Sequence, residues 1–449
     1  RLAETWTWQH LQQTRLPVYH LKDNLYIIRR YGKKLLSFYS NNSMVSAPQY
    51  LLVDSLRQNV HQQSYTTDDY IRGSLKIGEA VLSFRTGINA QLHRIRSRLY
   101  GLPDSIGTMH GENCFGYFKL YAEPDFEYSS SDFNVSLEMP LCYLYEKYSE
   151  DKGVREFVPE PLLRIRWQVT PCLRFSLQGG QTTEPLDAGR FHPSLILQDY
   201  EYINRGYSGY RHQRSNNLSA NILYQDAIHG THALIMISRS LITDPYSSTR
   251  DFIGNYIIQS ATDQQSKSRN WSAITFFSKG FDFLHGIVNL RGNYNCSNTS
   301  LIEDGVSHAY QSNFLSLQSS LDLSFYQDMH LTYSVTFSRN RMESESLSSN
   351  TTINNWHHDW TLTVPFKMIA FDLQAEYDHN QLLTRQYKDF FLVDAGIKYD
   401  IKHIGWELDF RNIFNKKTYS YVLNEDLIHS CSMNRIRGRE IMISASFHL

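Results

Sequence analysis

Apolar and polar side chains alternate with a period of two along most of this chain. Clear examples are residues 315–325, 331–338, 371–378, 393–401 and 406–411. Strict alternation of this kind predicts β-strands with one apolar and one polar face. The polar face carries Ser, Thr, Gln, Asp, Glu and Arg, which do not form a dry core. We therefore expect an all-β chain whose sheet meets water on one face and an apolar phase on the other.

The connections between the expected strands alternate between short and long. Short turns are expected near residues 78–79, 128–132, 171–172, 227–231, 279–280, 326–328, 366–370 and 403–404. Long loops are expected near residues 100–112, 146–160, 183–215, 244–265, 295–311, 342–353 and 415–435, and only the loop near 384–389 breaks the alternation. An outer-membrane barrel has short periplasmic turns and longer extracellular loops. A soluble sandwich has no reason to sort its connections in this way, and a filled soluble barrel needs an apolar interior.

The strands number about 17 from residue 64 onward. Their expected ranges are 64–77, 80–99, 113–127, 133–145, 161–170, 173–182, 216–226, 232–243, 266–278, 281–294, 312–325, 329–341, 354–365, 371–383, 390–402, 405–414 and 436–447. Residues 1–63 add two or three more, for example 24–30 and 34–40. We expect residues 1–449 to form one antiparallel transmembrane β-barrel domain with about 18–20 strands. Because an open edge in lipid leaves backbone groups unpaired, such a barrel has to close.

Composition and charge exclude several other classes of protein. An aromatic content of 14 %, a mean hydropathy of −0.44 and a net charge of −1 fit neither a nucleic-acid-binding nor a disordered chain. The longest aliphatic run is residues 233–237, whereas a membrane-spanning helix needs roughly 20 apolar residues. The five cysteines form no C-x-x-C motif, so neither a zinc site nor a redox pair is expected. No signal peptide follows Arg1, so the chain is either a mature form or has lost its N-terminus.

The last expected strand ends the chain on alternating apolar side chains. Ile441, Ile443, Phe447 and Leu449 share one face of this strand, and Gly438 precedes them. A terminal strand of this kind would invite edge-to-edge aggregation in a soluble protein. We interpret these five residues as an assembly signal for the outer membrane.

Two segments near the C-terminus resemble the end of TonB-dependent receptors, in the form found in Bacteroidetes. They are residues 406–419, Trp-Glu-Leu-Asp-Phe-Arg-Asn-Ile-Phe-Asn-Lys-Lys-Thr-Tyr, and residues 437–440, Arg-Gly-Arg-Glu. The resemblance implies a barrel of about 22 strands, a plug in its lumen and a TonB box. It also implies gated import of a bulky nutrient, such as a ferric chelate, cobalamin, a glycan or a peptide. Residues 1–110 contain expected hairpins in place of a plug or a TonB box. We therefore interpret the chain as the barrel portion of a longer receptor, truncated at its N-terminus and lacking the plug.

The same resemblance implies a location and a set of partners. The expected location is the outer membrane of a Gram-negative cell, where the barrel contacts the lipid bilayer. The expected protein partners are the outer-membrane barrel assembly machinery, the TonB system through a plug that is not present in this chain, and a surface substrate-binding lipoprotein. No nucleic acid, cofactor or metal is expected.

Other functions stay open for a barrel of this kind. They are a plug-free passive porin-like channel, an outer-membrane enzyme such as a lipase or protease, and an adhesion or structural barrel. Residues 206–210 nearly form a G-x-S-x-G nucleophile elbow, but the fifth residue is Tyr and an expected loop surrounds it. His357 and His358 are adjacent on an expected strand and point to opposite faces, so they cannot share a metal ion. No catalytic residue is expected.

Two groups of residues are candidates for binding the substrate. Exposed tyrosines suit stacking on sugars or aromatic ligands, and the long loop 183–215 contains Tyr200, Tyr202, Tyr207 and Tyr210. The second group is an arginine pair in the expected strand 161–170. Arg164 and Arg166 share its polar face and are expected to contact an anionic substrate or plug carboxylates. The alternative for this pair is a solvated face, balanced by the carboxylates of Glu138, Asp322 and Glu376.

Overall fold

The computed structural model describes the chain with several short gaps. The gaps are residues 1, 14–15, 32–33, 54–55, 101–108, 149–152, 186–193, 198–201, 207–211, 254–255, 304–305, 326–328, 345–348, 383–385, 402–403, 426–427 and 448–449. Within residues 1–57, 252–256, 301–305 and 423–432, and at a few single positions, the description is of the backbone with few or no side chains. The described residues contain no helix that could span a membrane.

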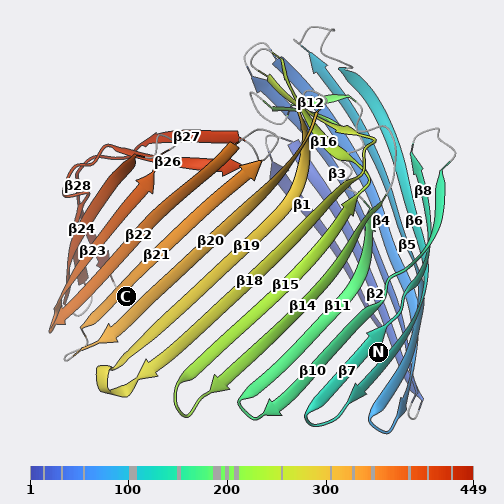
Figure 1. The fold of residues 1–449 in the computed structure, drawn as a ribbon, viewed down its shortest axis with the longest axis horizontal. Coiled ribbons are helices and arrows are strands. Elements are labelled where there is room, and N and C mark those ends of the chain that lie inside the picture. The colour runs from blue at the N-terminus through green and yellow to red at the C-terminus, as the bar shows by residue number, and fades with distance from the viewer. Residues whose placement is uncertain are drawn as a thin grey trace.

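One large antiparallel sheet forms the wall of the molecule, and its strands lie side by side in chain order (Figure 1). The wall strands are β1 (Leu2–Gln13), β2 (Leu16–Tyr31), β3 (Lys34–Val53), β4 (Leu56–Ile77), β5 (Ala80–Tyr100), β6 (His110–Ser129), β7 (Phe133–Glu138), β8 (Leu141–Tyr148), β9 (Val154–Pro159), β10 (Leu162–Thr170), β11 (Leu173–Pro185), β14 (His212–Asp226), β15 (Thr231–Asp244), β18 (Ser266–Phe281), β19 (Gly286–Glu303), β20 (Val306–Ser324), β21 (His330–Ser344), β22 (Ser349–Phe366), β23 (Ile369–Gln381), β24 (Tyr387–Ile401), β25 (Ile404–Arg411) and β28 (Glu440–Phe447). They occupy about 20 positions in the wall, because β7 with β8 and β9 with β10 each share one position. The expected all-β, antiparallel fold and its strand number are confirmed.

Proline breaks one strand that the alternation predicted as continuous. The expected strand 133–145 is divided into β7 and β8 by residues 139–140, although both parts pair with β6 in one register. Pro140 has no N–H to give to a ladder, which explains the interruption. The expected loop 146–160 was wrong in its second half, because β9 pairs there with β8.

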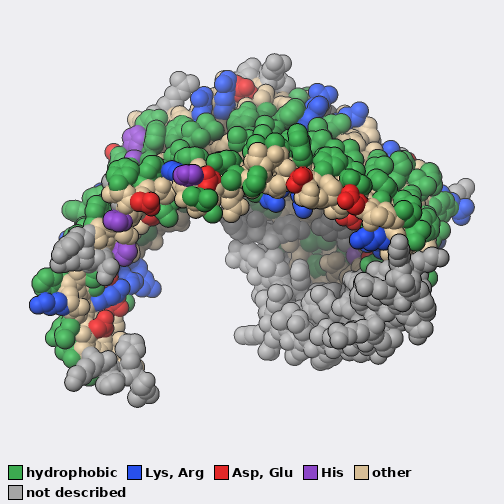
Figure 2. Space-filling view, turned by 90° about the horizontal axis from the view of Figure 1, so that it is seen from below, with side chains coloured by type: hydrophobic (Ala, Val, Ile, Leu, Met, Phe, Trp, Pro, Cys, Tyr) green, Lys and Arg blue, Asp and Glu red, His purple; other side chains and the backbone are tan. Residues whose placement is uncertain are grey.

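The two faces of the wall differ in polarity as the alternation predicts. On β5, the side chains of Leu82, Phe84 and Leu92 are 46–52 % exposed on one face. Figure 2 shows that hydrophobic side chains cover most of the convex side of the curved sheet. Between them, Ser83 and Arg85 point to the concave side, where Arg85 pairs with a carboxylate of β6. Apolar side chains on the outside and polar ones on the inside are typical of a wall that stands in lipid around an aqueous lumen.

The apolar belt has a limited height. On β5 it runs from Leu82 to Leu92, which matches the roughly 9–11 residues of a membrane-spanning strand. The next side chains on that face are Arg94 and Arg96, and both bind Glu112 of β6. Their hydrogen bonds, first that of Arg96 and then that of Arg94, lower the pKa of Glu112. The belt therefore ends where a charged cluster begins.

Aromatic rings gather at the edge of this belt on strands β21 to β23. Trp360 stacks between Tyr333 and His358, with ring centroids 5.4 and 5.5 Å away. Trp356 packs on Phe337 at 4.8 Å. Amphipathic rings of this kind are enriched at the boundary between a membrane and water. The group is of the type expected at the level of a membrane interface.

The short connections lie where they were expected. Tight turns occupy residues 78–79, 130–132, 171–172, 227–230 and 367–368. The turn expected near 279–280 is a 3₁₀ turn at Asp282–Leu284. The expected turns near 326–328 and 403–404 lie wholly or partly outside the described residues.

Most of the expected long loops contain strands. The connections 183–215, 244–265 and 415–435 contain β12 (Leu195–Leu197), β13 (Tyr202–Arg205), β16 (Ser247–Ile253), β17 (Tyr256–Thr262), β26 (Thr418–Glu425) and β27 (Ile428–Arg435). The loops expected at 295–311 and 342–353 were wrong, because the wall hairpins β19–β20 and β21–β22 continue through them as paired strands. Pairing beyond the apolar belt is possible because a polar hairpin satisfies its own backbone groups.

The two ends of the wall each have one neighbour among the described strands. β1 pairs with β2, and β28 pairs with β25. No ladder between β28 and β1 is present in the described residues. The described wall is thus an open, curved sheet.

A glycine–tyrosine contact fixes the packing of the concave face and provides a stability test. A Cβ added at Gly87 would lie 2.5 Å from the carbonyl oxygen of Asp69 and 2.6 Å from the hydroxyl of Tyr121. Replacement of Gly87 by Ala should therefore lower the free energy of unfolding by about 1–3 kcal/mol. The measurement is urea unfolding of the detergent-folded chain, followed by tryptophan fluorescence.

The matched control is Gly73→Ala on the neighbouring strand. A Cβ at Gly73 meets nothing within 4 Å, so this variant should stay within about 0.5 kcal/mol of the wild type. Equal stability of the two alanine variants would contradict the importance of the contact at Gly87.

Candidate ligand-binding lumen

Ion pairs line the concave face of the first described side-chain-bearing strands. Arg72 on β4 binds Asp125 on β6 at 2.9 Å, and Lys119 binds Glu160 at 2.6 Å. Arg85 pairs with the carboxylate of Glu123 and lies over the rings of two tyrosines, 5.1 and 5.4 Å from their centroids. The contact between Arg85 and Glu123 joins residues that are directly opposite on β5 and β6, whereas Arg72 reaches across β5 to Asp125 on β6. A face that is charged but internally paired can border water without a large net field.

Four short strands form a second layer inside the upper part of this wall. β12 pairs with β13, β13 runs parallel to β17, and β17 pairs with β16. β16 in turn pairs in parallel with the end of β19. We call β12, β13, β16 and β17 the mouth sheet. Figure 1 shows it at the upper end of the wall, away from the short turns.

A glutamine side chain joins the mouth sheet to the wall. The side-chain nitrogen of Gln58 donates to the carbonyl of Leu197 at 3.0 Å, and the N–H of Leu197 donates to the side-chain oxygen of Gln58 at 2.5 Å. Ser97 donates to the carbonyl of Leu195 at 3.3 Å. The amide group of Gln58 thus replaces a backbone partner for β12, and all four residues are buried.

Two hydrophobic clusters support this attachment. One consists of Leu99, Leu195, Leu197, Ile203 and Ile258, so it joins β5 to three strands of the mouth sheet. The other lies along β5, β6, β8 and β9 and also contains Tyr246, from the connection between β15 and β16. Both are packed cores inside the wall. They hold the long connections against the concave face, where sequence analysis expected long loops.

A charged cavity lies beside the mouth sheet. It has a volume of about 600 Å³, and its lining includes Glu146, Glu156, His212 and Arg214. The ring of His212 lies between two carboxylates, with Nδ1 3.3 Å from Glu146 and Nε2 3.3 Å from Glu156. Arg214 pairs with Glu156 as well. Because Glu146 is buried and the lining carries both signs of charge, the cavity suits a polar ligand with its own hydrogen-bonding groups.

The residues predicted to bind the substrate are placed as follows. Arg164 pairs with Glu138, one of the carboxylates expected to balance it, and Arg166 is exposed two residues further on. Tyr202 is partly buried at the start of β13, in the mouth sheet. Tyr200, Tyr207 and Tyr210 lie outside the described residues. The mouth sheet thus contains one of the predicted tyrosines, while the arginine pair lies on β10 of the wall.

Sequence reasoning missed the residues that line the cavity and hold the mouth sheet. Gln58 and Leu197 are 139 residues apart, and no periodicity connects them. Glu146 and His212 lie in the expected loops 146–160 and 183–215, which the alternation does not assign to strands. A buried Glu at the end of a strand is detectable only once its neighbours in space are known.

The segments that resemble the receptor C-terminus form a cluster of hydrogen bonds between β25 and β28, which we call the Asn412 cluster. Asn412, with a left-handed φ of 50°, donates to the carbonyls of Lys416 and Arg437 at 2.7 and 2.8 Å and accepts from the N–H of Lys416. Arg439 donates to the carbonyl of Ile413. The Asn412 cluster joins the two ends of the segment that contains the β26–β27 hairpin. It lies next to the ladder in which β28 joins the wall.

The residues interpreted as the assembly signal lie next to the Asn412 cluster. Gly438 approaches Asn415 so closely that a Cβ would lie 2.9 Å from its side-chain oxygen. Ile441, Ile443 and Phe447 are exposed on β28, opposite Phe410, Leu408 and Ile404 of β25. Leu449 lies outside the described residues. The strand therefore presents an apolar row, and its role in assembly stays a prediction.

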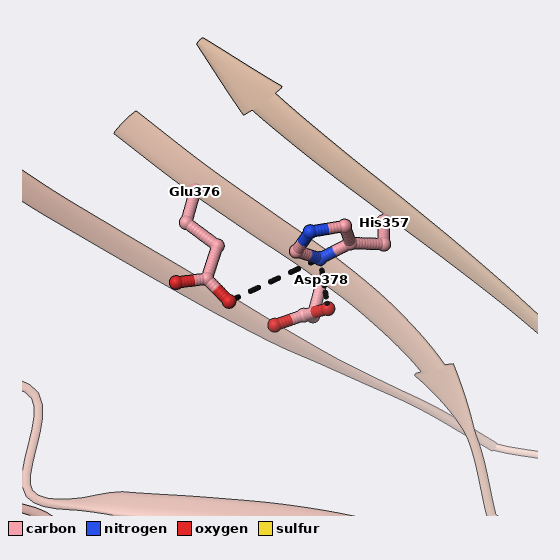
Figure 3. Close-up of side chains that lie close together, drawn as sticks. All are labelled: His357, Glu376 and Asp378. Carbon is pink, nitrogen blue, oxygen red and sulfur yellow. Dashed lines mark hydrogen bonds and ion pairs between the residues drawn. The ribbon is translucent and has the colours of Figure 1, made fainter. Parts of the chain in front are cut away.

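The two adjacent histidines lie on opposite faces, as predicted. His358 stacks among the rings of the convex face. His357 points to the concave face, beside Asp378 and Glu376 of β23 (Figure 3). These three side chains can hold a metal ion between them.

Comparisons with known proteins give no match by sequence and several by structure. No protein-family model and no curated protein matches the chain. The ferric yersiniabactin uptake receptor of Yersinia pestis is 11 % identical, with a TM-score of 0.42 over 96 % of this chain and 61 % of that one. A ferric citrate transporter in its unliganded form is 10 % identical, with a TM-score of 0.47 and the same coverage. A copper transporter is 9 % identical, with a TM-score of 0.49 over 96 % and 65 %. The chain spans less than two thirds of the length of each of these proteins.

The attachment of the mouth sheet can be tested at Gln58. Replacement by Leu removes the partners of the Leu197 N–H and carbonyl, at about 1–3 kcal/mol for each buried group. Amide hydrogen exchange in residues 194–197 and 202–206 should become at least tenfold faster, with little change in the wall strands. Gln62→Leu is the control, because Gln62 is exposed on the same strand. Unchanged exchange in the Gln58 variant would show that the hydrophobic cluster alone holds the mouth sheet.

The contribution of the Asn412 cluster to stability can be tested by replacing Asn412. Replacement by Ala removes three hydrogen bonds and leaves alanine in a left-handed conformation, so stability should fall by about 2–4 kcal/mol. Asn412→Asp keeps the acceptor oxygen and tolerates that conformation, so its loss should be intermediate. Urea unfolding checks both variants. An alanine variant as stable as the aspartate variant would contradict a role for the backbone conformation and the accepted bond.

Proposed function

We propose that this chain is the barrel portion of an outer-membrane transporter of the TonB-dependent type, importing a bulky nutrient by gated, energy-coupled uptake. The observation that carries the proposal is a single curved sheet with an apolar convex face, an ion-paired concave face and a mouth filled by its own long connections. A wall in lipid needs the first two features, and a selective entrance needs the third. Residues 406–419 and 437–440 suggest the family.

In this proposal the convex face contacts the outer-membrane lipid. The charged cluster at Arg94, Arg96 and Glu112 lies on the outer side of the bilayer, next to the mouth sheet. The short turns, such as residues 78–79 and 171–172, lie in the periplasm. Support comes from the length of the apolar stretch on β5 and from the aromatic rings at its edge.

The mouth sheet and the charged cavity beside it are the proposed place of substrate capture. A nutrient too large for passive diffusion first binds to the long connections, where Tyr200, Tyr202, Tyr207 and Tyr210 offer ring faces. It then meets the polar concave face, with Arg164 and Arg166 as contacts for anionic groups of the substrate or the plug. Nothing in this path requires covalent chemistry by the chain, so the proposed role is transport and not catalysis.

A complete receptor requires more than these 449 residues in this proposal. A plug occupies the lumen, a TonB box transmits energy from the inner membrane, and further strands pair with the edges of β1 and β28. The argument for additional strands is physical, because each unpaired N–H or carbonyl in lipid costs several kcal/mol. A surface lipoprotein that hands over the substrate would dock on the long hairpins.

The proposal predicts a closed and larger native protein. We expect the protein purified from outer membranes to have an intact mass well above 52.5 kDa. In liposomes it should not admit a small sugar such as arabinose, because a plugged lumen is sealed in the absence of energy. The measurements are intact-mass spectrometry and a liposome-swelling assay, with a general porin as the positive control.

The opposite results would select the porin-like alternative. A native mass of 52.5 kDa together with rapid swelling would mean an open channel without a plug. Lipid hydrolysis by the folded protein would instead support the enzyme alternative. A larger, sealed protein whose substrate uptake survives a protonophore would contradict energy coupling while leaving the barrel intact.

A further inference from the structure

We propose that His357, Glu376 and Asp378 form a binding site for a divalent transition-metal cation on the concave face. His357 is on β22, and Asp378 lies directly opposite on β23. Glu376 precedes Asp378 by two residues, so it lies on the same face of β23. In the part of the chain that the structure describes, this is the one group of three such side chains with ligand atoms all within 4.8 Å of one another. Figure 3 shows the imidazole and the two carboxylates converging from the two strands.

The distances fit a common cation. Nδ1 of His357 is 2.8 Å from Oδ1 of Asp378 and 3.9 Å from Oε1 of Glu376. An ion about 2.0–2.2 Å from each ligand holds those ligands roughly 3–4 Å apart in a tetrahedral arrangement. The distance to Glu376 already lies in this range, whereas the hydrogen bond between His357 and Asp378 has to open slightly, which rotation of these two side chains allows without movement of the strands.

The local charge also favours a cation. Among the described residues, both carboxylates have the His357 ring as their only ion-pair partner. Asp359 lies directly opposite Glu376 and adds a third carboxylate to the same face. Three acidic groups around one imidazole leave an excess of negative charge, which a divalent ion would balance.

A buried oxygen supplies an independent indication. Asp378 is 5 % exposed, and its Oδ2 has no hydrogen-bond partner in the described residues. A buried carboxylate oxygen without a partner is costly and calls for an explanation. Coordination of Asp378 to a cation would provide that partner.

The donor set selects the class of cation. One imidazole nitrogen and two carboxylate oxygens suit Zn²⁺ and similar first-row ions, while Ca²⁺ and Mg²⁺ prefer oxygen ligands alone. The group contains no thiolate, so it does not favour Cu⁺. Because the side chains of His357 and Glu376 are 42 % and 41 % exposed, positions on the ion stay open to water in the lumen. The site therefore binds an exchangeable ion and not a buried structural one.

The test is zinc binding by the full chain in detergent after treatment with EDTA. Isothermal titration with Zn²⁺ should give one site per chain, and Cu²⁺ as a spectroscopic probe should show coupling to one imidazole nitrogen. His357→Gln and Asp378→Asn should each weaken zinc binding at least tenfold. His358→Gln is the matched control, since it removes the neighbouring imidazole from the convex face.

Two results would overturn the site. One is the absence of zinc binding by the wild-type chain, which would leave only a hydrogen-bonded cross-strand pair. The other is unchanged affinity in both His357→Gln and Asp378→Asn. Because Asp378→Asn conserves shape and each variant's fold is checked by circular dichroism, lost binding can be separated from misfolding. None of these outcomes depends on transport, so they leave the proposed function untouched.

Discussion

Backbone hydrogen bonding is the constraint on which the rest of this structure depends. No water reaches the middle of a bilayer, so every N–H and carbonyl there needs a partner within the protein. The antiparallel ladder that runs through the wall provides those partners strand by strand. Because successive side chains of a strand point to opposite faces, the same ladder presents an apolar row on one face and a polar row on the other, and in the proposed transporter these rows meet lipid and water. The apolar convex face and the ion pairs of the concave face are thus two results of one geometry.

Outside the apolar belt this constraint is weaker, and the strands there depart from the regular antiparallel ladder. Strands there pair in parallel, as β13 does with β17, and a side chain can take the place of a backbone partner, as Gln58 does for Leu197. Packed clusters then form inside the wall between segments far apart in sequence. Selectivity in the proposed transporter would arise in this region, because only here can the chain vary without opening the ladder.

The sequence predicted the structure where the ladder is regular, and it did not predict the long-range contacts. Period-two alternation predicted most wall strands and the short turns, such as those at 78–79 and 171–172. It failed at 295–311 and 342–353, where Asn- and Ser-rich residues are paired strands without an apolar face. It could not predict the contact between Gln58 and Leu197, because long-range packing leaves no periodic signal. Of the predicted tyrosines, only Tyr202 lies within the described residues, and its role as a ligand contact stays a prediction.

The site at His357 shows how strongly local register limits sequence reasoning. In the structure Phe366 pairs with Ile369, and counting back along the hairpin sets His357 opposite Asp378. The expected strands 354–365 and 371–383, paired end to end, would instead set His357 opposite His379. A shift of one residue in a hairpin exchanges the faces of one strand relative to the other, so the acidic partners of His357 would have pointed to the apolar convex face. The aromatic convex face of β22 and β23 excludes that register, because two carboxylates in the apolar belt would have no water and no partner. The rings of Trp356 and Trp360 therefore fix which carboxylates reach His357 in the lumen.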